Sequence, residues 1–222
     1  MRVKEIIMSF FSSRRSSVHG LNGGVATSQP IASQVGIDVL KAGGNAVDAA
    51  VTMASTLGVV EPMSTGIGGD IFALIWDPKT EKISSFNGSG TSSRNSNPNE
   101  LLDKGFSSIP TEGKGGAYSV SVPGSVDGWE QILKKFGTIS LSESLQPGIK
   151  LAEEGYPVSE LISWAWAENE SKLKFRESGS ELLNKNNKAP VEGEVIRLPE
   201  LASSMYKISK EGPKVIYDGS IS

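Results

Sequence analysis

The chain has 222 residues, of which 37% are hydrophobic and 21% are charged, and its formal net charge is −3. This composition is typical of a soluble globular protein with a sizeable core, and the lack of a basic excess argues against a DNA- or RNA-binding protein. The chain contains no cysteine, which excludes disulfides, thiol nucleophiles and cysteine-based metal sites.

Residues 1–15 are predicted to form a polar lead-in to the folded part. An apolar stretch from Ile6 to Phe11 is interrupted by Ser9, and it is shorter than the apolar core of a signal peptide. No apolar run approaches the length needed to span a membrane. We therefore expect a cytoplasmic protein with no membrane partner.

A short strand at Gly23–Thr27 and two helices are predicted next. Pro30 fits the first turn of a helix because its missing N–H costs nothing there, and the glycine pair at 43–44 ends this helix. Asn45 caps a second helix, which runs to about Val60 and is apolar nearly all round. Such a helix is buried on more than one side.

A hairpin is predicted after these helices. The run Ile71–Trp76 is continuously apolar, which is the pattern of a buried strand, and we expect the preceding helix to be buried against its sheet. Lys82–Asn87 returns as the second arm of the hairpin. Asn87–Glu100 is predicted to be a polar loop, and Ser119–Val122 a further short strand.

The second half of the chain is predicted to be mainly helical, with a polar, turn-rich segment between Ser178 and Arg197. No repeat or linker divides residues 16–222, which we treat as one unit. Strands with helices on their flanks indicate a helix–sheet sandwich. The predicted helices are Val126–Phe136, Ser142–Glu154, Val158–Phe175 and Glu200–Glu211.

The glycines at Gly66, Gly68 and Gly69 do not form a nucleotide-binding motif. They follow a helix and precede a strand, whereas a dinucleotide fingerprint requires a strand, then glycines, then a helix. His19 is the only histidine, and it lies before the first core element. A serine–histidine–aspartate triad is therefore not expected.

No metal or cofactor is predicted. Glu153 and Glu154 are adjacent in the sequence, so their carboxylates do not converge on one helix face. Trp164 and Trp166 are interpreted as core or partner-surface residues rather than as a platform for a ligand.

Four ordered segments resemble the γ-glutamyltransferase family. The most specific is Gly-Gly-Asn-Ala-x-Asp-Ala at Gly43–Ala49, and Leu151–Val158 is also similar to the family. The resemblance covers about residues 16–222, which are predicted to be a partial large-subunit segment. The four segments are Val25–Pro30, Leu40–Ala50, Val59–Asp70 and Ser121–Gly124.

This resemblance implies an α+β fold, a layered αββα sandwich of the N-terminal-nucleophile hydrolase type, present here as an N-terminal fragment. Family members cut their own precursor and free a threonine at the start of a small subunit. The threonine hydroxyl is the nucleophile, and its own α-amino group is the adjacent base. That threonine lies well beyond residue 222 in family members, so no catalytic residue is expected in this chain.

One substrate contact of the family is altered here. Many members carry an arginine in an Asp-x-Arg-Glu-x-Ala-Pro segment after the hairpin, and this arginine binds the substrate α-carboxylate. In the simplest register Ser89 occupies its position, whereas Thr91 does so against the Asn-Gly-Ser-Gly-Arg-Ala-Pro pattern of a related branch. Arg94 is the candidate substrate-binding residue, because a loop that folds back would bring its charge to the same carboxylate.

The resemblance favours an enzyme that hydrolyses or transfers γ-glutamyl groups of small amides such as glutathione. Its partners would be the γ-glutamyl substrate and the missing small subunit, and neither nucleic acid nor membrane. Two alternatives stay open: a related acylase of different side-chain specificity, and a non-catalytic remnant that acts as a binding or assembly partner. The chain could be a gene fragment, a truncated gene prediction or one piece of a split protein.

Overall fold

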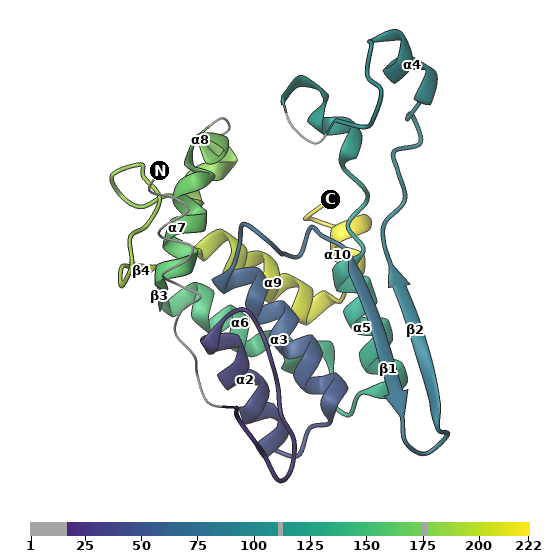
Figure 1. The fold of residues 1–222 in the computed structure, drawn as a ribbon, viewed down its shortest axis with the longest axis vertical. Coiled ribbons are helices and arrows are strands. Elements are labelled where there is room, and N and C mark those ends of the chain that lie inside the picture. Colours follow the sequence, from purple (N-terminus) through teal and green to yellow (C-terminus); the bar gives the residue numbers. More distant parts are fainter. Residues whose placement is uncertain (1–16, 111–112, 175–176) are drawn as a thin grey trace.

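The computed structural model describes residues 17–110, 113–174 and 177–222, so the predicted lead-in at 1–15 lies outside the described residues. Figure 1 shows a body of packed helices, a β-hairpin along one side of it, and a long excursion that extends beyond the hairpin. In chain order the elements are α2 (Pro30–Lys41), α3 (Ala46–Val60), β1 (Ile71–Asp77), β2 (Lys82–Gly88), α4 (Pro98–Asp103), the 3-10 helix η1 (Gly113–Ser119), α5 (Ser125–Phe136), α6 (Leu141–Glu154), β3 (Tyr156–Pro157), α7 (Glu160–Glu168), α8 (Glu170–Leu173), the 3-10 helix η2 (Glu177–Leu182), β4 (Val195–Ile196), α9 (Pro199–Glu211) and α10 (Lys214–Tyr217).

Helices α2 and α3 form where the sequence predicts them, because their ends carry strong local signals. Pro30 lies in the first turn of α2, and Gly43 follows its end with a φ of +97°. The Asn45 side chain accepts hydrogen bonds from the N–H groups of Val47 and Asp48, at 2.8 and 3.0 Å. The Asp48 carboxylate accepts from the Asn45 N–H at 2.8 Å, which completes a capping box.

Helix α3 packs between α2 and α6 (Figure 1). Among its residues, Ala46 and Ala50 are exposed, and the rest are buried or half-buried. The hydroxyl of Ser55 donates a hydrogen bond to the carbonyl of Ser144 in α6, at 3.1 Å. The predicted burial on more than one side is confirmed. In this chain, however, helices rather than a sheet cover most of α3.

The hairpin pairs β1 and β2 antiparallel, from Ile71 opposite Gly88 to Asp77 opposite Lys82. One of its faces packs on α5. A Cβ atom added at Gly128 of α5 would lie 2.3 Å from Cγ2 of Ile71. This glycine therefore lets the helix approach the hairpin closely.

The other face of the hairpin is open to solvent. Phe72, Leu74 and Trp76 are 68%, 79% and 56% exposed, and Ile83 on the neighbouring strand is 68% exposed. The apolar run Ile71–Trp76 predicted a buried strand, and in the described part of the chain only the face of β1 that packs on α5 is covered. In the described part of the chain a helical layer covers only one face of the hairpin. Because successive side chains of a strand point to opposite faces, more buried and more exposed residues alternate along β1.

The second half of the chain completes the helical core around α6 and α9. Tyr156 and Trp166 are each 1% exposed. The Tyr156 hydroxyl donates to the carbonyl of Val59 at 2.7 Å, which ties β3 to the end of α3. Burial raises the pKa of the Tyr156 hydroxyl well above its ordinary value. β3 and β4 form a two-residue antiparallel pair.

Two predicted strands are not present. Gly23–Thr27 is irregular and has no partner strand among the described residues; the Thr27 hydroxyl instead donates to a backbone carbonyl two residues later, at 2.6 Å. Ser119–Val122 begins at the last residue of η1 and does not pair as a strand, although the Val122 N–H donates to the Thr91 carbonyl at 2.9 Å. A segment whose residues favour the β conformation forms a strand only where a neighbouring strand supplies a ladder of hydrogen bonds.

Two further boundaries differ from the prediction. The helix expected at Val158–Phe175, of which Phe175 lies outside the described residues, is divided into α7 and α8 at Asn169, whose side-chain amide donates to the Ala165 carbonyl at 2.8 Å. The polar loop after β2 ends early, because Asn97 caps α4 by accepting from the Asn99 N–H at 3.0 Å. None of the helices in the described part of the chain is long and apolar enough to cross a membrane.

Candidate functional site

Residues 89–122 leave the hairpin as a long excursion, here called the arm, and its two ends meet near the end of β2 (Figure 1). The Gly69 carbonyl accepts hydrogen bonds from the N–H groups of Gly124 and Ser125, both at 2.9 Å. The Ser125 hydroxyl donates to the Ile67 carbonyl at 3.0 Å. We call this meeting place the base of the arm; it comprises residues 66–70, 87–91 and 121–125.

Asp70 joins both sides of the base. Its Oδ1 atom accepts from the Gly90 N–H at 3.2 Å and from the Ser121 hydroxyl at 3.4 Å. This contact was not predicted from the sequence. Asp70 and Ser121 both lie in segments that resemble the family, but they are 51 positions apart, and no local pattern indicates that they meet.

Glycines make this close approach possible. A Cβ atom at Gly90 would lie 1.5 Å from the Val122 carbonyl oxygen, and a Cβ at Gly124 would lie 2.1 Å from the Gly88 carbonyl oxygen. No larger residue fits at either position without a shift of the backbone. The outgoing and returning ends of the arm therefore touch backbone to backbone.

Ser89 and Thr91, the two residues that replace the family arginine in alternative registers, lie at this base. Both are exposed. The Ser89 N–H donates to the Asn87 side chain at 2.9 Å. Neither hydroxyl is hydrogen-bonded to another described residue, so both are available to a ligand.

Arg94 lies farther out, at the corner of a turn on the outgoing side of the arm. The Ser96 N–H closes this turn by donating to the Ser93 carbonyl at 3.0 Å. Arg94 is exposed, and it makes no hydrogen bond or ion pair with any other residue in the described ranges. The structure thus leaves its guanidinium group free, and substrate binding by Arg94 stays a prediction.

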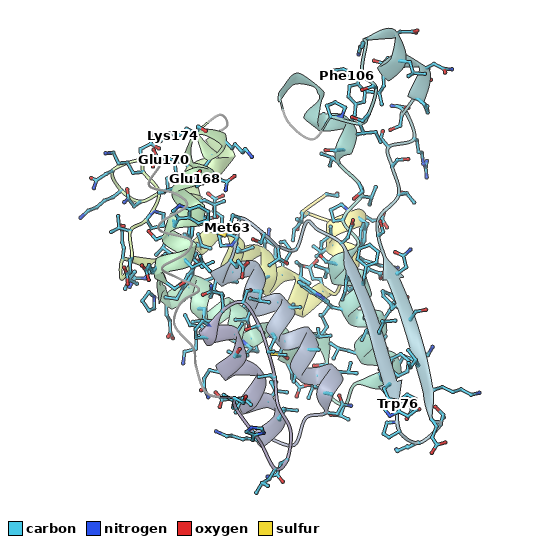
Figure 2. The ribbon with its side chains drawn as sticks, in the orientation of Figure 1. Met63, Trp76, Phe106, Glu168, Glu170 and Lys174 are labelled. Atoms are coloured by element: carbon cyan, nitrogen blue, oxygen red, sulfur yellow. The ribbon has the colours of Figure 1, made fainter. Side chains whose placement is uncertain are left out.

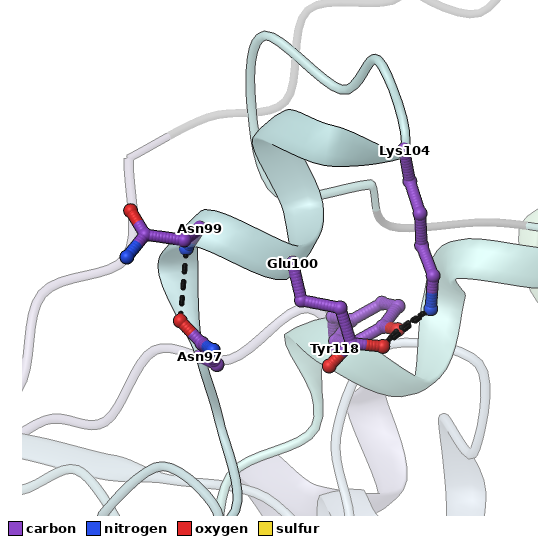
Figure 3. Close-up of polar contacts among 5 residues, drawn as sticks. All are labelled: Asn97, Asn99, Glu100, Lys104 and Tyr118. Carbon is purple, nitrogen blue, oxygen red and sulfur yellow. Dashed lines mark hydrogen bonds and ion pairs between the residues drawn. The ribbon is translucent and has the colours of Figure 1, made fainter.

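The outer part of the arm is braced by its own side chains (Figure 3). Lys104 pairs with the Glu100 carboxylate and contacts the Tyr118 hydroxyl at 2.5 Å, and that hydroxyl donates to Glu100 at 2.8 Å. The hydrogen bond from Lys104, followed by that from Tyr118, lowers the pKa of the Glu100 carboxyl group. This brace joins α4 to η1, and Figure 2 shows Phe106 in the same outer part, away from the helical body.

An apolar pocket of about 520 Å³ opens beside the base. One of its walls is Tyr217 of α10, whose hydroxyl donates to the Pro123 carbonyl at 2.7 Å. Burial raises the pKa of this hydroxyl. The base therefore combines exposed hydroxyl groups with an apolar wall. The residues that line the pocket are Ile67, Gly68, Val122, Pro123, Ile216, Tyr217 and Ile221.

The other residues weighed in the sequence analysis lie elsewhere. His19, Glu153 and Glu154 are exposed. Trp166 is buried in the core, whereas Trp164 is 49% exposed on α7. In the described ranges no group of three or more histidine, cysteine, aspartate or glutamate residues is placed to hold a metal ion.

The family model described as Gamma-glutamyltranspeptidase matches residues 32–222. The glutathione hydrolase proenzyme of Bacillus subtilis (strain 168) is 36% identical over 201 residues, which make up 90% of this chain and 34% of that protein. The chain thus spans about a third of the length of this curated relative.

Two solved structures are similar over nearly the whole chain. The γ-glutamyltranspeptidase of Helicobacter pylori superposes with a TM-score of 0.85 at 32% identity, covering 93% of this chain and 59% of that chain. A cephalosporin acylase from Bacillus halodurans superposes with a TM-score of 0.83 at 37% identity, covering 94% of this chain and 39% of that chain. These likenesses confirm the predicted fold class, the layered αββα sandwich of the N-terminal-nucleophile hydrolase type.

Proposed function

Because the chain belongs to the gamma-glutamyltranspeptidase family, whose members are hydrolases and transferases, we propose that it is the scaffold part of an enzyme that hydrolyses or transfers γ-glutamyl groups. The substrates would be small amides such as glutathione. The nucleophile would come from a further polypeptide, the small subunit, and none of the residues of this chain would form a covalent bond to the substrate.

The open face of the hairpin carries this proposal. Phe72, Leu74 and Trp76 form an exposed apolar row on β1, and monomeric proteins rarely leave such a row uncovered. The chain also spans 34% of the Bacillus subtilis relative. A second sheet from the remaining polypeptide would cover this row and complete the sandwich.

In the proposed reaction the hydroxyl oxygen of an N-terminal threonine attacks the acyl carbonyl carbon, and the threonine α-amino group takes the proton. The amide C–N bond then breaks, and the leaving amine receives that proton. Water or an amino acid next attacks the carbonyl carbon of the resulting ester and loses a proton to the threonine α-amino group; the C–O bond to threonine breaks, and the threonine oxygen takes up that proton to re-form the hydroxyl. Backbone N–H groups of the remaining polypeptide would stabilise the oxyanion.

The contribution of this chain to substrate binding would come from the arm. Arg94 is an exposed cation that makes no hydrogen bond or ion pair with another described residue, and a guanidinium group can bind a carboxylate through two parallel hydrogen bonds. We propose that Arg94 binds the α-carboxylate of the γ-glutamyl group in the assembled enzyme.

A second candidate function is that of an acylase whose acyl groups lack this α-carboxylate. Ser89 and Thr91 supply neutral hydroxyl groups where the family arginine would stand, and an apolar pocket of about 520 Å³ opens at the base of the arm, lined in part by Val122 and Pro123. The similar structure from Bacillus halodurans is a cephalosporin acylase. An apolar acyl group would bury its surface in this pocket.

Co-expression tests the proposal. The chain is produced together with the part of the Bacillus subtilis glutathione hydrolase proenzyme that lies beyond the region matched here, as two separate polypeptides. We expect release of the amine from a γ-glutamyl anilide by the pair, and none by either polypeptide alone. Turnover of an acyl anilide without an α-carboxylate, but not of the γ-glutamyl anilide, would favour the acylase.

Two results would contradict the proposed function. The first is equal turnover by the Bacillus subtilis part alone, because this chain would then contribute nothing. The second is a stable complex of the two polypeptides with no turnover of either anilide, which would favour the non-catalytic remnant.

A further inference from the structure

The backbone of residues 89–91, at the base of the arm, is held at three consecutive positions. The Ser89 N–H donates to the side chain of the residue two positions earlier, at 2.9 Å, and the Gly90 N–H donates to Asp70 Oδ1 at 3.2 Å. The Thr91 carbonyl accepts from a backbone N–H on the returning side of the arm, at 2.9 Å. Each residue of this stretch is thus tied to a different part of the base.

The side chains of the same stretch are left for a ligand. Ser89 and Thr91 are exposed, and neither hydroxyl bonds to another described residue. A hydroxyl group can donate one hydrogen bond and accept others, so the pair can bind a polar group of a substrate. A backbone that is already fixed, with side chains that are not yet engaged, suits a binding site because less freedom is lost when the ligand binds.

Asp70 supports the middle of this stretch. Its Oδ1 atom accepts from the Gly90 N–H and also, at 3.4 Å, from the Ser121 hydroxyl on the returning side. The two chain neighbours of Asp70 are fixed in turn. The Gly69 carbonyl accepts from two N–H groups at the start of α5, both at 2.9 Å, and Ile71 is the first residue of β1. Asp70 therefore ties the stretch to the hairpin and to α5.

We propose that Asp70 is a positioning residue, which holds residues 89–91 so that the hydroxyl groups of Ser89 and Thr91 meet the acyl group of the substrate. The inference rests on the proposed function, which places the substrate contacts of this chain in the arm. Asp70 itself touches no reacting atom and acts through the two hydroxyls. Its loss should therefore weaken substrate binding and leave the chemical step unchanged.

The other end of β1 offers a matched control. Asp77 accepts from the Lys79 N–H at 2.9 Å and from the Thr80 hydroxyl at 3.0 Å. Like Asp70, it thus receives one backbone and one hydroxyl hydrogen bond. Its partners, however, lie in the turn of the hairpin rather than in the arm. Asp70→Ala and Asp77→Ala therefore remove the same kinds of contact at opposite ends of one strand.

Kinetics of the assembled pair, this chain with the co-expressed Bacillus subtilis part, test the role. Asp70→Ala should raise KM for the γ-glutamyl anilide about tenfold and change kcat less than about twofold. Asp70→Asn keeps an oxygen that can accept both hydrogen bonds, so its KM should stay within about threefold of the unmodified value. Asp77→Ala should change neither constant. A fall in kcat with KM unchanged, or equal effects of Asp70→Ala and Asp77→Ala, would overturn the inference.

A double-mutant cycle shows whether Asp70 acts through the hydroxyls. In the Ser89→Ala/Thr91→Ala background the substrate contact is already lost, so adding Asp70→Ala should raise KM less than about twofold further. A rise of about tenfold in both backgrounds would contradict the positioning role, because Asp70 would then act independently of the two hydroxyls.

Hydrogen exchange tests the support without turnover. In the assembled pair, Asp70→Ala should make the Gly90 N–H exchange about tenfold faster or more, because this N–H loses its acceptor. Asp77→Ala should leave the Gly90 exchange rate unchanged. An unchanged rate in Asp70→Ala would overturn the inference even if KM rises, since the stretch would then have kept its support.

The outcomes separate this inference from the proposed function. Turnover of the γ-glutamyl anilide that is insensitive to Asp70→Ala supports the function and contradicts the inference. If the unmodified pair binds glutathione by calorimetry but turns over neither anilide, the function is contradicted. A rise of about tenfold in the glutathione Kd of Asp70→Ala then supports the positioning role, and an unchanged Kd contradicts it. A pair that neither binds glutathione nor turns over an anilide contradicts both.

Discussion

The carboxylate of Asp48 accepts two hydrogen bonds from Thr138, one from its N–H at 2.8 Å and one from its hydroxyl at 2.5 Å, across 90 positions of sequence. A third comes from the Ile139 N–H at 3.2 Å. Asn45 completes the joint, because its side-chain amide donates to the Phe136 carbonyl at 2.8 Å. In the segment that most specifically resembles the family, these two residues thus fasten the start of α3 to the loop between α5 and α6.

We expect Asp48→Asn to destabilise the chain by about 1.5–3 kcal/mol, because hydrogen bonds to a charged group are stronger than those between neutral groups. The amide nitrogen would also face N–H donors. Urea denaturation followed by circular dichroism measures the loss. Asp38→Asn is the control: Asp38 is exposed and accepts from Gln34, so its effect should stay within about 0.5 kcal/mol. Equal effects of the two substitutions would contradict the structural role of Asp48.

The same joint should make stability depend on pH. Burial alone raises the pKa of Asp48, but the hydrogen bonds from Thr138, Asn45 and Ile139 outweigh it, and the net pKa lies below the ordinary value. A depressed carboxyl pKa stabilises the fold above the unfolded pKa of about 3.9, and this contribution is lost as the pH falls through the folded pKa. The difference in urea midpoint between the unmodified chain and Asp48→Asn should therefore be largest near neutral pH and become smaller below about pH 4. A difference independent of pH would contradict this assignment.

Gly90→Ala should loosen the base of the arm, since the added Cβ would lie 1.5 Å from the Val122 carbonyl oxygen. We expect the Val122 N–H, which donates to Thr91 at 2.9 Å, to exchange about tenfold faster or more, equivalent to about 1.4 kcal/mol of local opening. Gly68→Ala is the control, because no atom lies within 4 Å of a Cβ at that position. Unchanged exchange in Gly90→Ala would show that the backbone contact is not needed.

Arg94→Ala is expected to lower kcat/KM of the assembled enzyme for γ-glutamyl anilide about ten- to a hundredfold, through loss of a charge-assisted hydrogen bond. Anilides without an α-carboxylate should be unaffected. Arg197→Ala, at another exposed arginine, serves as the control and should change neither activity. If Arg94→Ala has no effect, the gain in γ-glutamyl turnover of Ser89→Arg and Thr91→Arg decides which register holds the family contact.

The exposed row on β1 should make the isolated chain associate. Leu74 is 79% exposed on the open face, and an uncovered apolar row favours self-association. We expect light scattering to show concentration-dependent aggregation of the unmodified chain, reduced in Leu74→Lys. Leu161→Lys on α7 is the control, since Leu161 is 53% exposed but lies outside this row. A clean monomer of the unmodified chain at high concentration would contradict this expectation.

The sequence by itself determined the elements whose signals are local. Pro30 and Asn45 begin α2 and α3 as predicted, and the hairpin forms where Ile71–Trp76 and Lys82–Asn87 flank a turn. Proline geometry, side-chain capping and turn chemistry act within a few residues, so the sequence reports them directly. Ordered family segments identified the family for the same reason, because they require only residue identity and order.

Only the tertiary structure decided which distant residues meet and which faces stay open. Asp70 accepts hydrogen bonds from Gly90 and Ser121, and Asp48 accepts one from Thr138. No periodic pattern in the sequence indicates that these residues meet. The apolar run of β1 predicted a buried strand, yet Leu74 is exposed while the opposite face packs on α5. Hydrophobicity records what a side chain favours, whereas burial depends on which other layers are present to cover it.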